Sequence, residues 1–134
     1  MSFRLELDSV NKIVRLSLQG EVTDEFFWVG YEALRNCCNQ YCPCRCIVDY
    51  SEATKVKISS GDVRYLASKP PIFPLDCLTL NVAPQDEMYG IARMFQSVAE
   101  NRPNFLVVRT MEEALDLLEL KSPKFEAIEV RLDT

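Results

Sequence analysis

The stretch CLTLNVAPQDEMYGIARMFQSVAENRPNFLVVRTMEEALDLLEL, residues 77–120, contains two short apolar runs, and each run is followed by a helical pattern. The runs at 77–83 and 104–109 are typical of buried strands, because they are short, apolar and bounded by turn residues. The segments at 86–101 and 110–120 repeat their apolar residues at helical spacing. Strands and helices in alternation predict an α/β fold in which helices pack against a sheet.

The residues upstream continue this alternation. The run CRCIVDYS, residues 44–51, predicts another buried strand, which ends at Asp49. The stretch ISSGDVRYLAS, residues 58–68, predicts a short helix that begins after Ser59 or Ser60, since a serine hydroxyl can accept a bond from a free amide of the first turn.

The N-terminal part alternates apolar with polar residues in FRLELD (3–8) and KIVRLSLQG (12–20). Turn residues separate the two segments, so the chain is expected to open with a β-hairpin. The segment at 22–38 then becomes helical, with Thr23 or Asp24 as its N-terminal cap.

Apolar stripes on the predicted helices indicate which sides face the sheet. The helix at 22–38 carries Phe27, Tyr31, Leu34 and Cys38 in its stripe. The helix at 86–101 carries Met88, Ile91, Phe95 and Val98. In the last helix, Thr110 and Glu113 have the spacing of a capping box.

Length and composition fit a single globular domain that spans residues 1–134. The alternating tail at 121–134 predicts a further C-terminal strand, which could also pair across a homodimer edge. No apolar run reaches the roughly 20 residues that a membrane span needs, and the N-terminus lacks a signal-peptide core. We therefore expect a cytoplasmic protein.

Charge and residue usage exclude several classes of function. The formal net charge is −5 and the basic residues are scattered, which disfavours nucleic-acid binding. The sequence has no histidine, so Ser-His-Asp and Cys-His catalysis are excluded. Because no phosphate-binding loop or catalytic pair is evident either, we expect a protein that is not an enzyme and needs no cofactor.

Five of the six cysteines lie in CCNQYCPCRC, residues 37–46. Structural zinc sites usually use two separated cysteine pairs, and the remaining Cys77 stands alone. We interpret the cluster as a helix end and a strand start that use cysteine as a small buried residue, with Cys44 and Cys46 on the same face of the strand. No metal site is predicted.

Two segments resemble a known family. IVDYSEATKVKISSGDVRYLA, residues 47–67, resembles the central segment of STAS domains, in which a strand ends in Asp-x-Ser and an Asp-Ser-Ser-Gly loop opens the next helix. Residues 81–118 resemble single-domain SpoIIAA-like proteins, which carry Tyr-Gly-x-Ala-Arg-Met-Phe and then Thr-x-Glu-Glu-Ala-x-x-x-Leu. The resemblance covers about residues 3–120 and implies a STAS-like mixed β-sheet with helices packed against it.

The resemblance implies a non-catalytic binding module. SpoIIAA-like proteins are regarded as candidate carriers of apolar or amphipathic molecules with peripheral membrane contact, and this is our leading hypothesis. The alternative is a protein–protein regulatory module of the anti-sigma-factor-antagonist kind, switched by phosphorylation of Ser60. Ser60 matches the phosphorylated serine of the family, although Ile58 stands where the family has aspartate. Without the resemblance, Ser60 is a plain helix cap.

The loop KPPIFPL, residues 69–75, contains three prolines and cannot be regular structure. Its apolar residues predict a lid over a pocket or a surface for a membrane or partner, whereas the simpler interpretation is that they pack on the core. Together with the resemblance, the loop predicts a ligand site lined by Tyr65, Ile72, Phe73, Leu75 and Tyr89. Arg93 is a candidate for an anionic head group, or a partner of Asp86.

Overall fold

The structure is a computed structural model that describes residues 2–74, 76–99 and 102–129. The elements in chain order are β1 (Ser2–Asp8), β2 (Ile13–Thr23), α1 (Asp24–Tyr41), β3 (Arg45–Asp49), β4 (Ala53–Lys57), α2 (Ser60–Ser68), β5 (Thr79–Val82), α3 (Asp86–Val98), β6 (Phe105–Val108), α4 (Met111–Leu117) and β7 (Glu126–Ala127). The predicted α/β class and the opening hairpin are confirmed. No helix in these ranges is long and apolar enough to cross a membrane.

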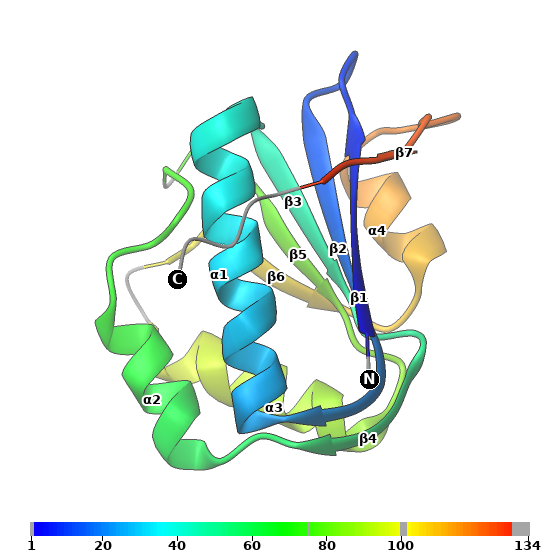
Figure 1. Ribbon diagram of the computed structural model, residues 1–134. Helices are drawn as coiled ribbons and strands as arrows, with labels where there is room; N and C mark the ends of the chain where they lie inside the picture. The colour runs from blue at the N-terminus through cyan, green and yellow to red at the C-terminus, as the bar shows by residue number, and fades with distance from the viewer. Residues whose placement is uncertain (1, 75, 100–101, 130–134) are drawn as a thin grey trace.

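A mixed sheet forms the centre of the molecule, with the strand order β6-β5-β3-β2-β1-β7. The pairs β2–β3, β3–β5 and β5–β6 are parallel, whereas β1 pairs antiparallel with β2 and with β7. Figure 1 shows α1 in front of the sheet and α4 behind it. The parallel strands are therefore covered on both faces, as the short apolar runs predict.

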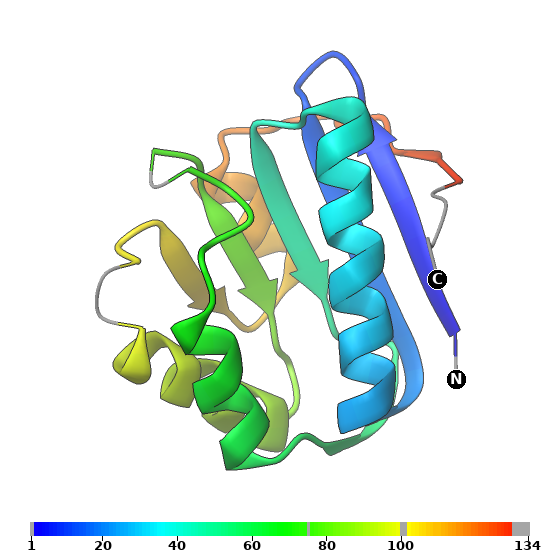
Figure 2. The same ribbon diagram turned by 60° about the vertical axis from the view of Figure 1, so that its left-hand side comes forward.

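Each face of the sheet has its own core. On the face covered by α1 and α3, the buried residues of β2, such as Leu16 and Leu18, pack with Phe26, Leu34 and Met88. On the other face, the buried residues come from the strands and from α4 and comprise Ile13, Ile47, Leu80, Val82, Val108, Ala114 and Leu118. Figure 2 shows α2 and α3 side by side on the same face as α1.

The two predicted helix stripes were partly wrong. In α1 the fully buried side is shifted by one residue, to Phe26, Gly30, Ala33, Leu34 and Cys37. The shift brings α1 close to the sheet at Gly30, where a Cβ would lie 3.1 Å from Leu18 Cδ2. In α3, Met88, Ala92 and Phe95 are buried, whereas Val98 in the last turn is 44% exposed.

The strand β4 is absent from the sequence-based prediction. It pairs in parallel with the C-terminal part of β2, after a register shift between Gly20 and Glu21. Gly20 has φ 85°, a conformation that glycine adopts without the penalty of a Cβ. The strand β2 therefore pairs with β3 along its first half and with β4 along its last residues.

Asp8 joins the hairpin turn to the C-terminal tail. Its carboxylate is 2% exposed and accepts bonds from the amides of Val10, Asn11 and Lys124 and from the Asn11 side chain. These bonds, above all the one from the Asn11 amide, lower the pKa of Asp8. The tail then pairs with β1 of its own chain through Glu126 and Ala127.

Candidate functional site

The first turn of α2 presents two serines to solvent. Ser59 is the N-cap, and its hydroxyl accepts a bond from the Asp62 amide at 3.2 Å. Ser60, the first helical residue, is exposed. The Asp24 carboxylate at the start of α1 accepts a bond from the Ser59 amide at 2.8 Å. The N-termini of α1 and α2 therefore lie next to each other.

An aromatic cluster connects the same two helices. Trp28 of α1 donates from Nε1 to the Asp62 carboxylate of α2 at 2.7 Å, and its ring meets Tyr65 edge-on at 5.5 Å between centroids. Tyr65 is 56% exposed, and the Lys69 ammonium lies 5.0 Å from the centre of its ring. This surface combines exposed aromatic area with a fixed polar contact, which is a common composition for a protein-binding surface.

A cavity of about 130 Å³ lies between the sheet and the helices α1, α2 and α3. Its floor is formed by β2, β3 and β5, and residues 71–73 of the loop before β5 also line it. The apolar side chains around it include Leu18, Phe27, Tyr31, Leu34, Val48, Val63, Leu66, Ile72, Phe73, Met88, Ile91 and Phe95. The volume approaches the ~150 Å³ of an apolar protein cavity that admits benzene.

Polar residues also line the cavity. They are Arg102 and Asn104 near the start of β6, with Asn81 and Thr79 on the floor. Arg102 Nε and Asn104 Oδ1 are buried and have no hydrogen-bond partner among the described residues. Unpaired polar atoms in a buried position are costly, so these two atoms need an explanation.

The structure brings together part of the predicted ligand site. Ile72 and Phe73 line the cavity, and Phe73 is 5% exposed. Tyr65 lies on the outer surface with Trp28, and Tyr89 lies under the Arg109 guanidinium, 4.5 Å from its ring centre. Neither tyrosine lines the cavity.

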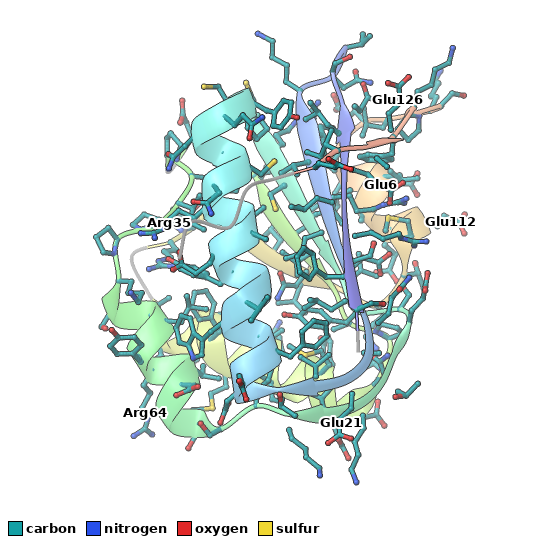
Figure 3. The ribbon with its side chains drawn as sticks, in the orientation of Figure 1. Glu6, Glu21, Arg35, Arg64, Glu112 and Glu126 are labelled. Carbon is teal, nitrogen blue, oxygen red and sulfur yellow. The ribbon has the colours of Figure 1, made fainter. Side chains whose placement is uncertain are left out.

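The remaining two predicted site residues are Arg93 and Leu75. Arg93 is exposed on α3, and Asp86, its predicted partner, instead forms an ion pair with Arg109 at 2.6 Å. Leu75 lies outside the residues that the structure describes. Figure 3 shows that Arg64 also projects outward from α2.

The cysteines are free thiols in different environments. Cys37 and Cys46 are buried, whereas Cys42 and Cys44 are exposed. The strand β3 begins at Arg45, so the prediction that Cys44 and Cys46 share one strand face was wrong. Burial raises the pKa of Cys37 to about 11, so that this thiol stays protonated near neutral pH. Within the described ranges, no three acidic, cysteine or histidine residues are placed to hold a metal ion.

Several cavity residues were missed as site residues by sequence reasoning. Phe27, Tyr31 and Leu34 were interpreted as core, and their helical spacing was the signal that they share a side. Arg102 and Asn104 belong to the turn between α3 and β6, and nothing in that turn distinguishes them from ordinary loop residues.

Comparisons with known proteins identify the fold. No family model and no curated protein matches the sequence. The anti-sigma factor antagonist SpoIIAA in its unphosphorylated form matches with a TM-score of 0.59 and 16% identity, over 88% of this chain and 98% of that chain. The Bacillus cell fate determinant SpoIIAA in the phosphorylated form matches with a TM-score of 0.52 and 20% identity, over 87% of this chain and 99% of that chain. The predicted SpoIIAA-like, STAS-like fold is confirmed.

Proposed function

We propose that this chain, which has the SpoIIAA-like fold, is a non-catalytic regulatory module that binds a protein partner where α1 and α2 begin. The observation that carries the proposal is the exposed Ser60 in the first turn of α2. It is supported by the likeness in fold to an anti-sigma factor antagonist that has been solved in unphosphorylated and phosphorylated forms.

Phosphorylation of Ser60 would act on this surface mainly through charge. A phosphate adds about −1.5 to −2 charges at neutral pH. Asp62, two residues after Ser60, accepts a hydrogen bond from Trp28 Nε1. Asp24 accepts a hydrogen bond from the amide of the neighbouring Ser59. Like-charge repulsion would weaken both contacts between α1 and α2, although the helix N-terminus partly offsets it. Modification would therefore change the shape and the charge of the partner surface together.

The test uses Ser60→Asp and Ser60→Ala in affinity capture from a lysate of the source organism, quantified by mass spectrometry. We expect Ser60→Asp to reduce recovery of the specific partner by about tenfold or more, because a charge in a contact surface commonly costs that much. Ser60→Ala is expected to retain the partner. The emission of Trp28, the single tryptophan, reports in parallel whether α2 has moved.

Ser97→Asp is the matched control. Ser97 is exposed on α3, so it receives the same charge outside the proposed surface. A partner that is lost equally with Ser60→Asp and Ser97→Asp is sensitive to total charge and not to this site. If neither Ser60 variant changes binding, the proposed role of Ser60 is wrong.

A second candidate function is that of a carrier for an apolar or amphipathic small molecule, and the cavity favours it. Leu18, Phe27 and Ile91 give the cavity an apolar wall, and the loop residues Ile72 and Phe73 turn toward it. This orientation supports a lid more than direct contact of these side chains with a membrane. The molecule would have to be small, since the volume is about 130 Å³.

Cumene, an apolar ring with a short branch, is a suitable probe for the cavity. We expect cumene to raise the melting temperature of the wild type, because a ligand that binds the folded state stabilises it. Ala92→Leu fills the cavity from α3, where Ala92 is 1% exposed, and should abolish the shift. Ser97→Leu adds the same bulk at an exposed position of α3 and should retain it. A wild type that takes up neither cumene nor the smaller benzene contradicts the carrier function.

A further inference from the structure

Two cysteines lie where the neighbouring strands β3 and β5 begin. Cys46 of β3 is aligned with Thr79 of β5 in a parallel pair. The same register, continued by two residues toward the start of each strand, places Cys44 opposite Cys77. The Cys46 amide donates to the Leu78 carbonyl at 3.0 Å, so the two segments still lie side by side just before β5 begins. Residues opposite each other in parallel strands direct their side chains to the same face of the sheet.

The fold holds the backbones of both cysteines in place. The Cys44 amide donates to the Lys12 carbonyl at 2.8 Å. The Cys77 amide donates to the Pro74 carbonyl at 3.0 Å, and the Cys77 carbonyl accepts from Asn104 Nδ2 at 2.5 Å. Neighbouring strands lie about 4.8 Å apart, within the roughly 4.4–6.8 Å between Cα atoms that a disulfide bridges. Rotation of the two side chains therefore suffices to bring the sulfur atoms together.

The two thiols differ in their environments. Cys44 is exposed, whereas Cys77 is half-buried and packs against the core on the α1 side of the sheet. Burial raises the pKa of Cys77, and so does the Asp76 carboxylate, to which Cys77 Sγ donates at 3.7 Å. Cys44 adds to this shift, which places the two thiols within electrostatic range of each other. Cys44 is therefore the thiol that a dissolved oxidant reaches first.

We propose that Cys44 and Cys77 form a reversible disulfide when the protein reacts with a low-molecular-weight disulfide, and that this bond stabilises the fold. The Cys44 thiolate attacks one sulfur of the small disulfide, forms a mixed disulfide and releases the first small thiolate. The Cys77 thiolate then attacks Cys44 Sγ and releases the second. The two protein thiols are oxidised, the small disulfide is reduced to two thiols, and these take up the two protons. The site depends neither on the proposed partner surface nor on the cavity.

The other cysteines near Cys44 are less suited to this reaction. Burial raises the pKa of Cys37 to about 11 and that of Cys38 to about 12, and Cys46 is fully buried. These thiols stay protonated near neutral pH and react slowly, because the thiolate is the nucleophile. Cys42 is exposed, and a single residue separates it from Cys44. Cys42 is therefore the competitor that an experiment has to exclude.

The experiment treats the reduced full chain with oxidised glutathione and maps the disulfides by mass spectrometry of tryptic peptides without reduction. We expect the peptide 36–45 to be joined to the peptide 65–93, which contains Cys77. Cys44→Ser should abolish the joined pair, whereas the matched control Cys42→Ser should retain it. The proposal is wrong if the pair forms as readily in Cys44→Ser as in the wild type. It is equally wrong if the wild type carries glutathione without forming the pair.

Thermal unfolding tests the effect of the bond on the fold. A bond between residues 44 and 77 closes a loop and lowers the conformational entropy of the unfolded chain. We expect the oxidised wild type to melt about 5 °C or more above the reduced form, and excess dithiothreitol to remove the increase. Cys42→Ser should show the same increase and Cys77→Ser none. If the bond between Cys44 and Cys77 forms but the melting temperature does not rise, the proposed stabilisation is wrong.

Discussion

Leu80→Ala is expected to lower the free energy of unfolding by about 3–4 kcal/mol, the usual cost of deleting a fully buried leucine side chain. Leu80 lies in β5, is 0% exposed, and packs against the α4 side of the sheet with Ile47, Val82 and Ala114. The cost combines lost apolar burial with the cavity that remains, because strands on both sides prevent β5 from collapsing into the space. Urea denaturation followed by circular dichroism measures the change.

Leu117→Ala is the matched control for this prediction. Leu117 belongs to α4 but is 48% exposed, so the same chemical change should alter the free energy of unfolding by less than about 0.5 kcal/mol. Equal losses in the two variants would contradict the arrangement of α4 on this face. Because the small-molecule cavity lies on the opposite face, folded Leu80→Ala should still bind cumene.

Asp8→Ala is expected to destabilise the protein by about 2–3 kcal/mol, because it removes a charged acceptor shared by four donors. The donors come from Val10, Asn11 and Lys124, so the variant loosens the hairpin turn and the tail at once. Asp116→Ala, at an exposed position on α4, removes the same charge without these bonds and serves as the control. Equal stability of the two variants would contradict the role of Asp8.

The contribution of Asp8 also depends on pH. Its pKa in the folded state lies below the ordinary aspartate value of 3.8, so the unfolded chain binds the proton more readily than the folded chain does. The stabilisation is therefore fully present well above pH 3.8 and is lost as the pH falls through the lower folded value. Wild type and Asp8→Ala should differ most near neutral pH and converge in acid, as unfolding curves at several pH values will show. A constant difference down to strong acid would contradict this account.

Much of the fold could be predicted from local sequence signals. Of the predicted alternatives, Thr23 caps α1 and Ser59 caps α2, and Thr110 caps α4 as predicted, since capping depends on residues within one turn. The buried strands β3, β5 and β6 followed from short apolar runs, whose signal is also local. These elements in this order sufficed to predict the α/β class.

The missed features depend on contacts between distant segments. The strand β4 has two buried residues, Ala53 and Val56, and exists because β2 changes its partner at Gly20. Arg102 and Asn104 line the cavity because the fold brings Leu66, Lys69, Pro74 and Cys77 beside them. Hydrophobic periodicity carries no information about such pairings, so neither feature could be derived from it.

The change of pairing partner along β2, from β3 to β4, also predicts two regions whose amides exchange hydrogen at different rates. Amides of β2 from Ile13 to Ser17 lie between β1 and β3 and should exchange only when the whole domain unfolds. Among the described residues, β4 pairs with no strand other than β2. In α2, Val63 is the one buried residue of the described chain. The β4–α2 segment should therefore open as a separate unit at a lower free energy. Such opening would admit a small molecule to the cavity while the sheet remains intact.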